Sequence, residues 1–585
     1  MLEASDRWHS GTQDSRPEAQ LIDRARLLAS DTLVANPGGG NFSVKAPTSR
    51  PGSPSGEVMW ISGWGCDGAT LRQEDLACLR VADVRAARDQ PALATGSMMN
   101  YLVGCATSDG QPRPAIETLL HGYLVHAHVD HTHPEAVIAL TATPRGRELA
   151  AEVFGDEAIW LDYVQFSPAL AVDLAAEIAA RPAARYVLLA NHGLLTWADS
   201  SEQAYQNTIE ATIRAGRALD AAAVRPADLG GLACPLPSPD LVENYFTDVL
   251  PALRGWLSAD GRAKILRIDP DSSATAFACS ARGPWLSMLG PACPDSLVKM
   301  KRTPVIAPGV PADGPDGRRA AVASAVESFR DDYRRYWRRH APSGSRLPVG
   351  ADLPRVVVIR GIGVVSAGED ERIAWLAEAH FRQTRHVVEA ADAAGGYGSL
   401  SERQAFADEY WPLMREKPQL RETPGRLAGR IVLVRPGAGE LASLVPELAR
   451  ILLSEGAHVV VAGPLDAPAP GLRLRYDALH APVRACVLAF GGLDIVVDLD
   501  PVHHPAARLA AQAADVLRQQ GWPGCYLAIS GGSAARPGMA EVLGAVRRAA
   551  RGWLAAHSVT TPGSAEAVAH YVAALSSPAG QERYA

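Results

Sequence analysis

Hydrophobic and polar residues follow the spacings of helices and strands along the N-terminal third of the chain. Residues 18–33 (EAQLIDRARLLASDTL) carry apolar residues three and four apart and precede NPGGGN, which predicts a helix that ends at a glycine-rich turn. Residues 57–71 predict a strand that runs into another glycine-rich turn. Residues 115–127 (AIETLLHGYLVHA) predict a helix behind a proline, and VDHTH predicts a short strand. Residues 184–197 predict two strands around Asn-His-Gly, followed by a long helix.

The same plan recurs later in the chain. Residues 355–388 repeat the order strand, glycine turn, strand, acidic helix start and long helix that residues 186–219 show. In this pairing Gly363 falls on Gly193, and Ile362 falls on His192. The pairing suggests a second, degenerate copy of the first region, although any strand, turn and helix unit looks somewhat like another.

The last part of the chain has the pattern of a doubly wound fold. Residues 427–463 predict a strand, a glycine turn, a helix and a strand, and residues 490–500 and 524–530 supply further strands. A chain of 585 residues exceeds the roughly 250–300 residues of one core. We therefore expect an α/β protein with three regions: residues 18–220, 221–425 and 426–585.

Composition narrows the class of protein without defining it. Hydrophobic residues at 47%, charged residues at 21% and a net charge of -7 are ordinary, and they argue against nucleic acid or a membrane surface as a partner. The eight cysteines form no C-x-x-C pair, which argues against a zinc ribbon, a redox motif and a disulfide framework. The polar N-terminus has no apolar signal segment, and no apolar run reaches the ~18 residues of a membrane span. We expect a cytoplasmic protein that acts on a small molecule.

The candidate chemistry lies in a cluster of histidines. Five of the 16 histidines fall between residues 121 and 133. Because side chains alternate along a strand, His131 and His133 share one face of VDHTH, while His128 and Asp130 share the other. His192, in the Asn-His-Gly turn, is a third candidate ligand, and the following glycine allows a tight turn there. Three neutral imidazoles leave an open position on a zinc-like ion.

Glu117 precedes this strand in the first turn of the predicted helix, where the helix dipole favours a carboxylate. Beside a metal ion it could be a fourth ligand or a base. The alternative is that all these histidines are ordinary surface or core residues, as a lone histidine usually is. His-x-His on one strand, a third histidine and an upstream glutamate together favour the metal site, and structural or supporting roles suit His121, His126 and His128.

These residues resemble the class II aldolase/adducin family over residues 20–215. The motifs that carry the resemblance occur in the family's order: GNFS (40–43), SGW (62–64), PAIE (114–117), HTHPEAV (131–137) and LLANHGLLTW (188–197). HVDHTHPEAVIALT, GPACPDSLVKMKR, VVSAG and GGYGSLSERQAFADEYWPL are similar to fused bifunctional aldolase/short-chain dehydrogenases, some tied to rhamnose breakdown. The resemblance then extends over nearly the whole chain.

The resemblance implies a zinc-dependent lyase. His131, His133 and His192 would hold Zn²⁺ or another divalent ion, and Glu117 would be the acid/base beside it. The metal would polarise the oxygens of a ketose, such as one like rhamnulose 1-phosphate, and stabilise the enediolate left when an aldehyde is released.

The resemblance also implies the groups that bind the substrate. Asn41, Ser62 and Gly63 match positions that hold a substrate phosphate. Tyr163 matches a tyrosine that serves as a proton donor, often across a subunit interface, so we expect a homo-oligomer. Two departures bear on the substrate: Ala115 and Ile116 replace phosphate-binding serines, and the loop SGWGCDGATL is longer than in relatives.

The C-terminal region lacks the residues of a working dehydrogenase. Arg435 and Pro436 stand where a short-chain dehydrogenase has T-G, and Glu440, Leu441 and Ala442 stand where it has G-x-G. No Tyr-x-x-x-Lys occurs after residue 500. We therefore expect a Rossmann-like domain that does not bind NAD(P).

Three alternatives remain open at this point. The chain could be a non-catalytic scaffold, as adducin-type members of the family are, although a scaffold has no need of the three histidines and the glutamate. The same metal site could run epimerisation or decarboxylation. An active NAD-linked dehydrogenase in addition to the aldolase is the third.

Overall fold

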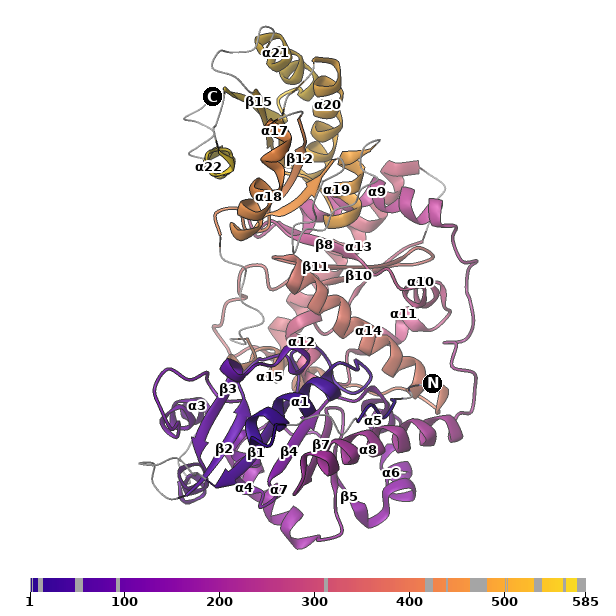
Figure 1. Ribbon diagram of the computed structural model, residues 1–585. Helices are drawn as coiled ribbons and strands as arrows, with labels where there is room; N and C mark the ends of the chain where they lie inside the picture. Colours follow the sequence, from indigo (N-terminus) through magenta and orange to yellow (C-terminus); the bar gives the residue numbers. More distant parts are fainter. Residues whose placement is uncertain are drawn as a thin grey trace. The chain divides into compact units, whose positions relative to one another are not determined.

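In the computed structural model, the strands of the described residues form three β-sheets (Figure 1). Its chain forms two compact units, which are described separately: unit 1 comprises Met1–Ala233, Ser280–Pro304 and Ala379–Arg421, and unit 2 comprises Cys234–Cys279, Val305–Glu378 and Glu422–Ala585. The structure describes residues 2, 4–8, 14–47, 56–90, 95–309, 314–415, 425–437, 440–462, 481–499, 501, 503–530, 539–560 and 564–575.

Unit 1 is built on a seven-stranded sheet. All neighbouring strands are antiparallel except the last pair, which is parallel. The order across the sheet is β3 (Leu76–Arg80), β2 (Glu57–Ser62), β1 (Asn41–Pro47), β4 (His128–Thr132), β7 (Gly193–Ala198), β6 (Tyr186–Leu189) and β5 (Ala158–Leu161).

Helices cover both faces of this sheet. Apolar residues of α1 (Pro17–Ala29) and α8 (Ser201–Ala221) form one core with β1, and α4 (Thr118–Tyr123) and α7 (Pro168–Ala180) contribute to a larger core on the other face. Other helices of unit 1 are α2 (Val81–Ala86), α3 (Thr95–Gly104), α5 (Glu135–Thr141), α6 (Gly146–Phe154), α11 (Gly283–Leu286), α12 (Pro294–Met300), α15 (Glu402–Glu409) and α16 (Pro412–Arg415).

Strand alternation in β4 is confirmed by its buried partners. Arg24 of α1 donates to Nδ1 of His128 at 2.7 Å and pairs with Asp130 at 2.9 Å, and the Arg24 and Asp130 side chains are fully buried. Val129 belongs to the core on the opposite face. His131 therefore points away from α1, as the spacing predicts.

The helix predicted over residues 115–127 is shorter than expected. It spans Thr118–Tyr123, and Glu117 occupies the position before its first turn. The physical reason is that the preceding chain is bonded as a strand: Trp64 N donates to Arg113 O at 2.7 Å, and Pro114 forms a bridge with Gly63. Glu117 consequently lies in the turn that joins this extended segment to the helix.

Unit 2 contains a four-stranded sheet with the same topology as part of unit 1. Its order is β8 (Ile265–Ile268), β11 (Gly363–Gly368), β10 (Val356–Ile359) and β9 (Val305–Ala307), and the last pair alone is parallel. The strands β4, β7, β6 and β5 have this order and these directions, and α14 (Glu371–Ala393) follows β11 as α8 follows β7. An internal duplication would give this topology.

The parallel sheet predicted from residue 427 onward is present in unit 2. Five parallel strands run in the order β13 (His458–Val461), β12 (Ile431–Arg435), β14 (Ile495–Leu499), β15 (Gly524–Ser530) and β16 (Leu554–Thr560). On one face α18 (Val445–Ser454) and α22 (Ala565–Leu575) pack in a shared core. Other helices of unit 2 are α9 (Pro239–Leu257), α10 (Ser272–Cys279), α13 (Gly314–His340), α17 (Glu440–Ser443), α19 (Pro482–Phe490), α20 (His503–Gln520) and α21 (Met539–Ala550).

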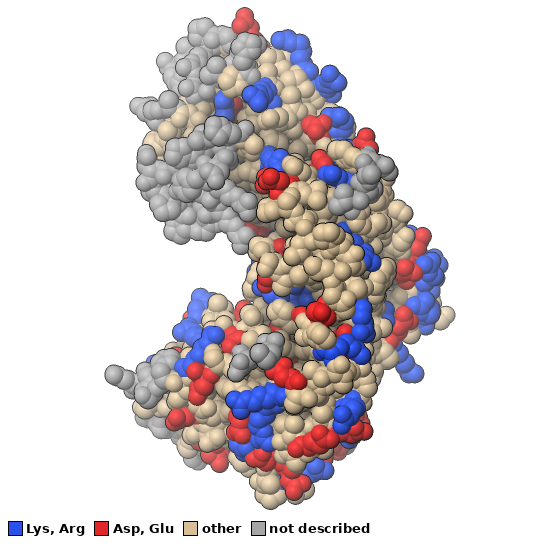
Figure 2. Space-filling view, turned by 90° about the vertical axis from the view of Figure 1, so that its right-hand side faces the viewer, with Lys and Arg blue, Asp and Glu red and all other residues tan. Residues whose placement is uncertain are grey.

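The surface carries both signs of charge. On the face shown in Figure 2, basic and acidic side chains of the described residues are interspersed. Within the described ranges, no helix combines the length and the apolar character of a membrane span.

Candidate metal centre

Three histidine side chains of unit 1 meet at the end of β4. The ring centroids of His131 and His133 are 4.8 Å apart, and the ring centroid of His192 lies 4.9 Å from that of His131 and 5.3 Å from that of His133. One nitrogen of each ring lies within 4.8 Å of the other two. His131 and His133 are buried and His192 is half-buried, so the structure brings together the three predicted ligands.

The hydrogen bonds of the two buried rings fit a metal ion. Nδ1 of His131 lies 3.1 Å from the carbonyl oxygen of Leu194, and Nδ1 of His133 lies 2.9 Å from Oδ1 of Asn36, so both Nδ1 atoms must donate. Their Nε2 atoms then carry lone pairs, yet these atoms lie only 3.2 Å apart. Two nitrogens bound to one zinc ion at about 2.0–2.1 Å and the tetrahedral angle would be about 3.3 Å apart.

A network of side-chain amides orients His133. Asn36 accepts from the ring and donates from Nδ2 to Oε1 of Gln383 at 3.0 Å, and Gln383 Nε2 donates to the carbonyl oxygen of His133 at 3.0 Å. Gly39 lies against the same ring, since a Cβ there would be 2.6 Å from His133 Nδ1. These contacts hold the ring in one tautomer and orientation.

His192 is held by the turn between β6 and β7. Asn191 has the positive φ of this turn, 52°, and its side chain donates to Gly398 O at 3.3 Å. Gly193 is required by close packing instead, because a Cβ there would lie 2.4 Å from Thr132 O and 2.7 Å from a carbon of the His133 ring. The turn therefore lies where the sequence predicts it, but the residue with a positive φ is Asn191 and not the glycine after His192.

Glu117 lies in the same cavity as the triad. Its Oε2 accepts from Nδ2 of Asn41 at 2.8 Å, while Oδ1 of Asn41 is buried and has no hydrogen-bond partner among the described residues. A buried acceptor without a partner is costly unless a ligand supplies a donor. Asn41 can thus hold the carboxylate of Glu117 and accept from a bound hydroxyl.

Of the three remaining predicted residues, two line the triad cavity and one does not. Gly63 and Tyr163 line the cavity. Ser62 does not belong to the described lining, and its hydroxyl accepts from Phe42 N at 3.1 Å. Its predicted part in substrate binding stays a prediction. Among the described lining residues there is no Lys or Arg.

Two carboxylates of the cavity were not predicted. Asp295 lies 3.9 Å from His133 Nδ1 and pairs with the buried Lys299 at 3.2 Å. Asp408 of α15 accepts a short hydrogen bond from the Tyr163 hydroxyl. Both lie in motifs that carry the family resemblance, GPACPDSLVKMKR and GGYGSLSERQAFADEYWPL, but their spacing does not indicate chemistry.

The other histidines of the cluster have structural partners. His121 is buried and contacts Ser43 Oγ at 2.8 Å, and His126 lies 3.2 Å from Asp199 at the surface. Burial and the nearby Arg24 guanidinium lower the pKa of His128 to about 3, so it stays neutral. The structure places none of these three in the triad cavity.

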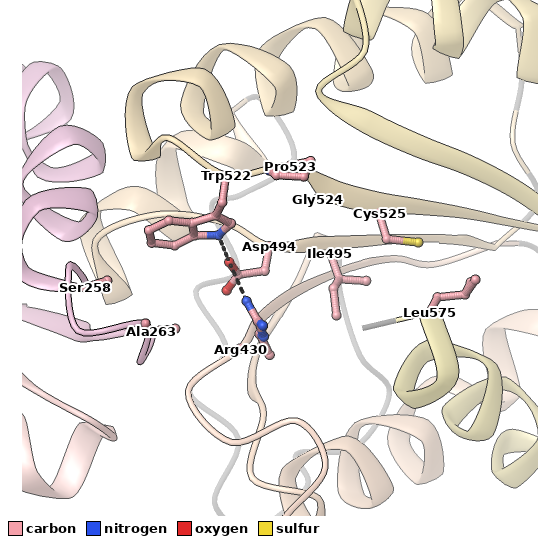
Figure 3. A pocket seen from close by; sticks show the side chains of 11 residues that line it. Ser258, Ala263, Arg430, Asp494, Ile495, Trp522, Pro523, Gly524, Cys525 and Leu575 are labelled. Atoms are coloured by element: carbon pink, nitrogen blue, oxygen red, sulfur yellow. Dashed lines mark hydrogen bonds and ion pairs between the residues drawn. The ribbon is translucent and has the colours of Figure 1, made fainter. Parts of the chain in front are cut away.

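A second cavity, of about 320 Å³, lies in unit 2 at the amino ends of β14 and β15 (Figure 3). Its charged groups are paired: Asp494 accepts from Trp522 Nε1 at 2.9 Å, lies 3.8 Å from Arg430 and forms a buried ion pair with Arg254 at 2.8 Å. Ligands of doubly wound folds bind at the carboxyl ends of the strands, so this cavity lies at the opposite edge.

An ion pair with two hydrogen bonds lies at the carboxyl edge of the parallel sheet. Arg435, at the end of β12, makes two hydrogen bonds of 2.6 Å to Asp498 on the neighbouring β14, and Tyr526 also donates to Asp498. Strand order reverses between β12 and β14, which is where doubly wound folds bind nucleotides. The side chain of Glu440, which stands where a short-chain dehydrogenase has the first glycine of G-x-G, lies outside the described residues.

Comparisons with known proteins show the family of the chain. Residues 19–216 match the class II aldolase and adducin N-terminal domain, and residues 245–417 match the second domain of class II aldolases. The chain belongs to the class II aldolase and adducin family. It is 32% identical over 515 residues to the protein named uncharacterized oxidoreductase YuxG of Bacillus subtilis (strain 168), which covers 84% of this chain and 74% of that protein.

Solved structures are similar to part of this chain. An N-terminal class II aldolase domain of a conserved protein from Thermoplasma acidophilum is 26% identical and covers 37% of this chain and 98% of that one, with a TM-score of 0.34. An L-fuculose 1-phosphate aldolase is 20% identical and covers 40% of this chain and 96% of that one, with a TM-score of 0.26.

Proposed function

We propose that this protein is a divalent-metal-dependent lyase, with zinc as the expected ion, that cleaves a carbon–carbon bond of a ketose or ketose phosphate and releases an aldehyde. The observation that carries the proposal is the convergence of His131, His133 and His192 in one cavity with Glu117. When bound, the ion would act as a Lewis acid toward the oxygens of the substrate.

Glu117 is suited to move the proton at carbon. Cleavage leaves a carbanionic fragment that must gain a proton at carbon, and the reverse condensation needs a base at the same atom. The amide of Asn41 fixes one carboxylate oxygen at 2.8 Å, so the other oxygen can face the substrate. Positioning of this kind supports proton transfer at a defined atom.

Asn41, Ser62 and Gly63 are proposed to bind the substrate at the end of the cavity beside Glu117. The lining there offers Ala115 and Ile116 in place of hydroxyl donors. A ketose with the shape of rhamnulose 1-phosphate is the expected substrate, and both free sugars and their 1-phosphates belong in the test.

The parallel-sheet domain is proposed to serve assembly of the protein instead of hydride transfer. The Arg435–Asp498 pair supports this proposal, because it occupies the edge where a dinucleotide would bind. We also propose a homo-oligomer that works in the cytoplasm.

The test is a screen of ketoses and their 1-phosphates for metal-dependent aldehyde release. Glu117→Gln should lower kcat by about 10²–10⁴-fold, as expected for loss of a general acid/base. Glu148→Gln, at a side chain that is 68% exposed, serves as the matched control and should have wild-type kcat. A Glu117→Gln variant as fast as the wild type would contradict the role of this carboxylate. If no ketose gives metal-dependent aldehyde release, the lyase proposal itself is contradicted.

A further inference from the structure

Asp408 is a buried carboxylate whose hydrogen-bond partners among the described residues are neutral side chains. The residue is 3% exposed and lines the triad cavity. The hydroxyl of Tyr163 donates to Oδ2, and Nε2 of Gln165 donates to Oδ1 at 3.1 Å. Neither partner carries a charge that would compensate a buried carboxylate.

Five other buried carboxylates in the described part of the chain are each paired with a lysine or arginine. The shortest distances are 2.9 Å for Asp130–Arg24, 3.2 Å for Asp295–Lys299, 3.1 Å for Glu409–Lys301, 2.8 Å for Asp494–Arg254 and 2.6 Å for Asp498–Arg435. Asp408 forms no ion pair with any described residue, although its neighbour Glu409 does. Burial accordingly raises the pKa of Asp408, and the hydrogen bonds from Tyr163 and Gln165 offset only part of this shift.

A buried carboxylate without a cation destabilises the fold, so its presence in a cavity needs a reason other than stability. Tyr163 faces the same cavity and packs against Leu297, Leu400 and Ala405, which fixes its ring. Its hydroxyl is therefore held between Asp408 and the space beside the triad.

The family resemblance implies that Tyr163 transfers a proton at the substrate. We propose that Asp408 is the partner with which Tyr163 exchanges this proton, so that the two residues form a relay that takes the proton from the substrate hydroxyl whose carbon becomes the aldehyde, and returns it in the condensation direction. This inference rests on the proposed lyase function and assigns Asp408 a part in it.

The substrate hydroxyl gives its proton to the Tyr163 oxygen while the Tyr163 proton passes to Oδ2 of Asp408. The oxygen forms the aldehyde C=O bond as the carbon–carbon bond breaks, and the bonding electron pair stays on the ketone fragment. Protonated Glu117 gives its proton to that carbon. Exchange with water then deprotonates Asp408 and reprotonates Glu117.

One proton thus moves at the substrate oxygen and another at the carbon, and the two transfers can be measured separately. Exchange of the carbon-bound protons of dihydroxyacetone or its phosphate with D₂O, followed by NMR, requires the base at carbon alone. Aldehyde release, or condensation of dihydroxyacetone phosphate with glycolaldehyde, also requires the proton at oxygen.

The experiment compares Asp408→Asn, Tyr163→Phe and the double variant in both assays. We expect kcat for cleavage to fall by about 10²–10⁴-fold in each single variant, with KM changed little and proton exchange retained. The double variant should be no slower than the slower single variant, because the pair acts as a unit. Asp162→Asn is the matched control, since Asp162 adjoins Tyr163 but is 75% exposed.

Stability separates the relay from a structural role. Asparagine can still accept from Tyr163, and it removes a buried charge, so Asp408→Asn should keep or raise Tm. Wild-type kcat in Asp408→Asn overturns the relay while leaving the lyase intact; should that variant not fold, wild-type kcat in Tyr163→Phe does the same. A wild-type protein without exchange or cleavage overturns the lyase and the relay together.

Discussion

Replacement of Gly39 by alanine tests how the fold prepares His133 for a metal ion. The backbone of Gly39 lies against the polar atoms behind this ring. An added Cβ would be 1.8 Å from Oδ1 of Asn36, 2.5 Å from Oδ2 of Asp295 and 2.6 Å from Nδ1 of His133. A Cβ does not approach other heavy atoms within 3.0 Å in stable packing. We therefore expect the Asn36 side chain to move and its 2.9 Å hydrogen bond to His133 to be lost.

The expected effect follows from the role of that hydrogen bond. Loss of a partner that orients a metal ligand lowers metal affinity by about 10–100-fold, which corresponds to about 1.4–2.7 kcal/mol of binding free energy. Overpacking by one methyl group should lower the free energy of unfolding by about 1–3 kcal/mol. Competition of the protein with a zinc chelator measures the first quantity, and urea denaturation of the metal-free protein measures the second.

Gly104→Ala is the matched control. Gly104 is the last residue of α3, and nothing lies within 4 Å of a Cβ there, so this variant should bind zinc like the wild type. Wild-type zinc affinity in Gly39→Ala would refute the reasoning, because the Asn36 hydrogen bond would then not matter for the ligand.

Three further results are expected. Burial lowers the pKa of Lys45 to about 7, so between pH 7 and 9 the folded chain releases this proton while the unfolded chain keeps it. The free energy of unfolding should therefore rise over this pH range by up to about 1.4 kcal/mol per pH unit. Urea denaturation measures this rise, which the Lys45→Met variant should lack. Arg24→Met leaves Asp130 buried without its cation and should cost about 3–5 kcal/mol in the same measurement, whereas Arg24→Met combined with Asp130→Leu should cost clearly less; equal costs would contradict the account. The full-length protein should not change the fluorescence of NADH, and saturable NADH binding would restore the dehydrogenase alternative.

Much of the fold follows from local pattern. The period of apolar residues located α1, α8 and α14, and the alternation of side chains in VDHTH separated His131 from His128 and Asp130. These features depend on neighbours in the sequence, which is why a single sequence reveals them. The extent of α4 does not follow from local pattern, because its start is set by backbone pairing of residues 113–114 with residues 63–64, just after β2.

The surroundings of the triad depend on contacts across the sequence. Gln383 reaches the backbone of His133 from 250 positions away, and Asp408 meets Tyr163 from 245 positions away. No spacing within a segment indicates such contacts. The histidines themselves were predictable because His-x-His on a strand is a local pattern, and His192 was predictable from its turn.

Metal content tests the central claim most directly. The purified protein, dialysed against zinc and analysed by mass spectrometry of metals, should hold about one ion per chain, and His131→Ala, His133→Ala and His192→Ala should each lose it. His126→Ala is the control from the same cluster, since His126 contacts Asp199 outside the cavity and should not affect the ion. Zinc bound at full stoichiometry by all three triad variants, or no zinc in the wild type, would contradict the assignment of a metal centre to these histidines.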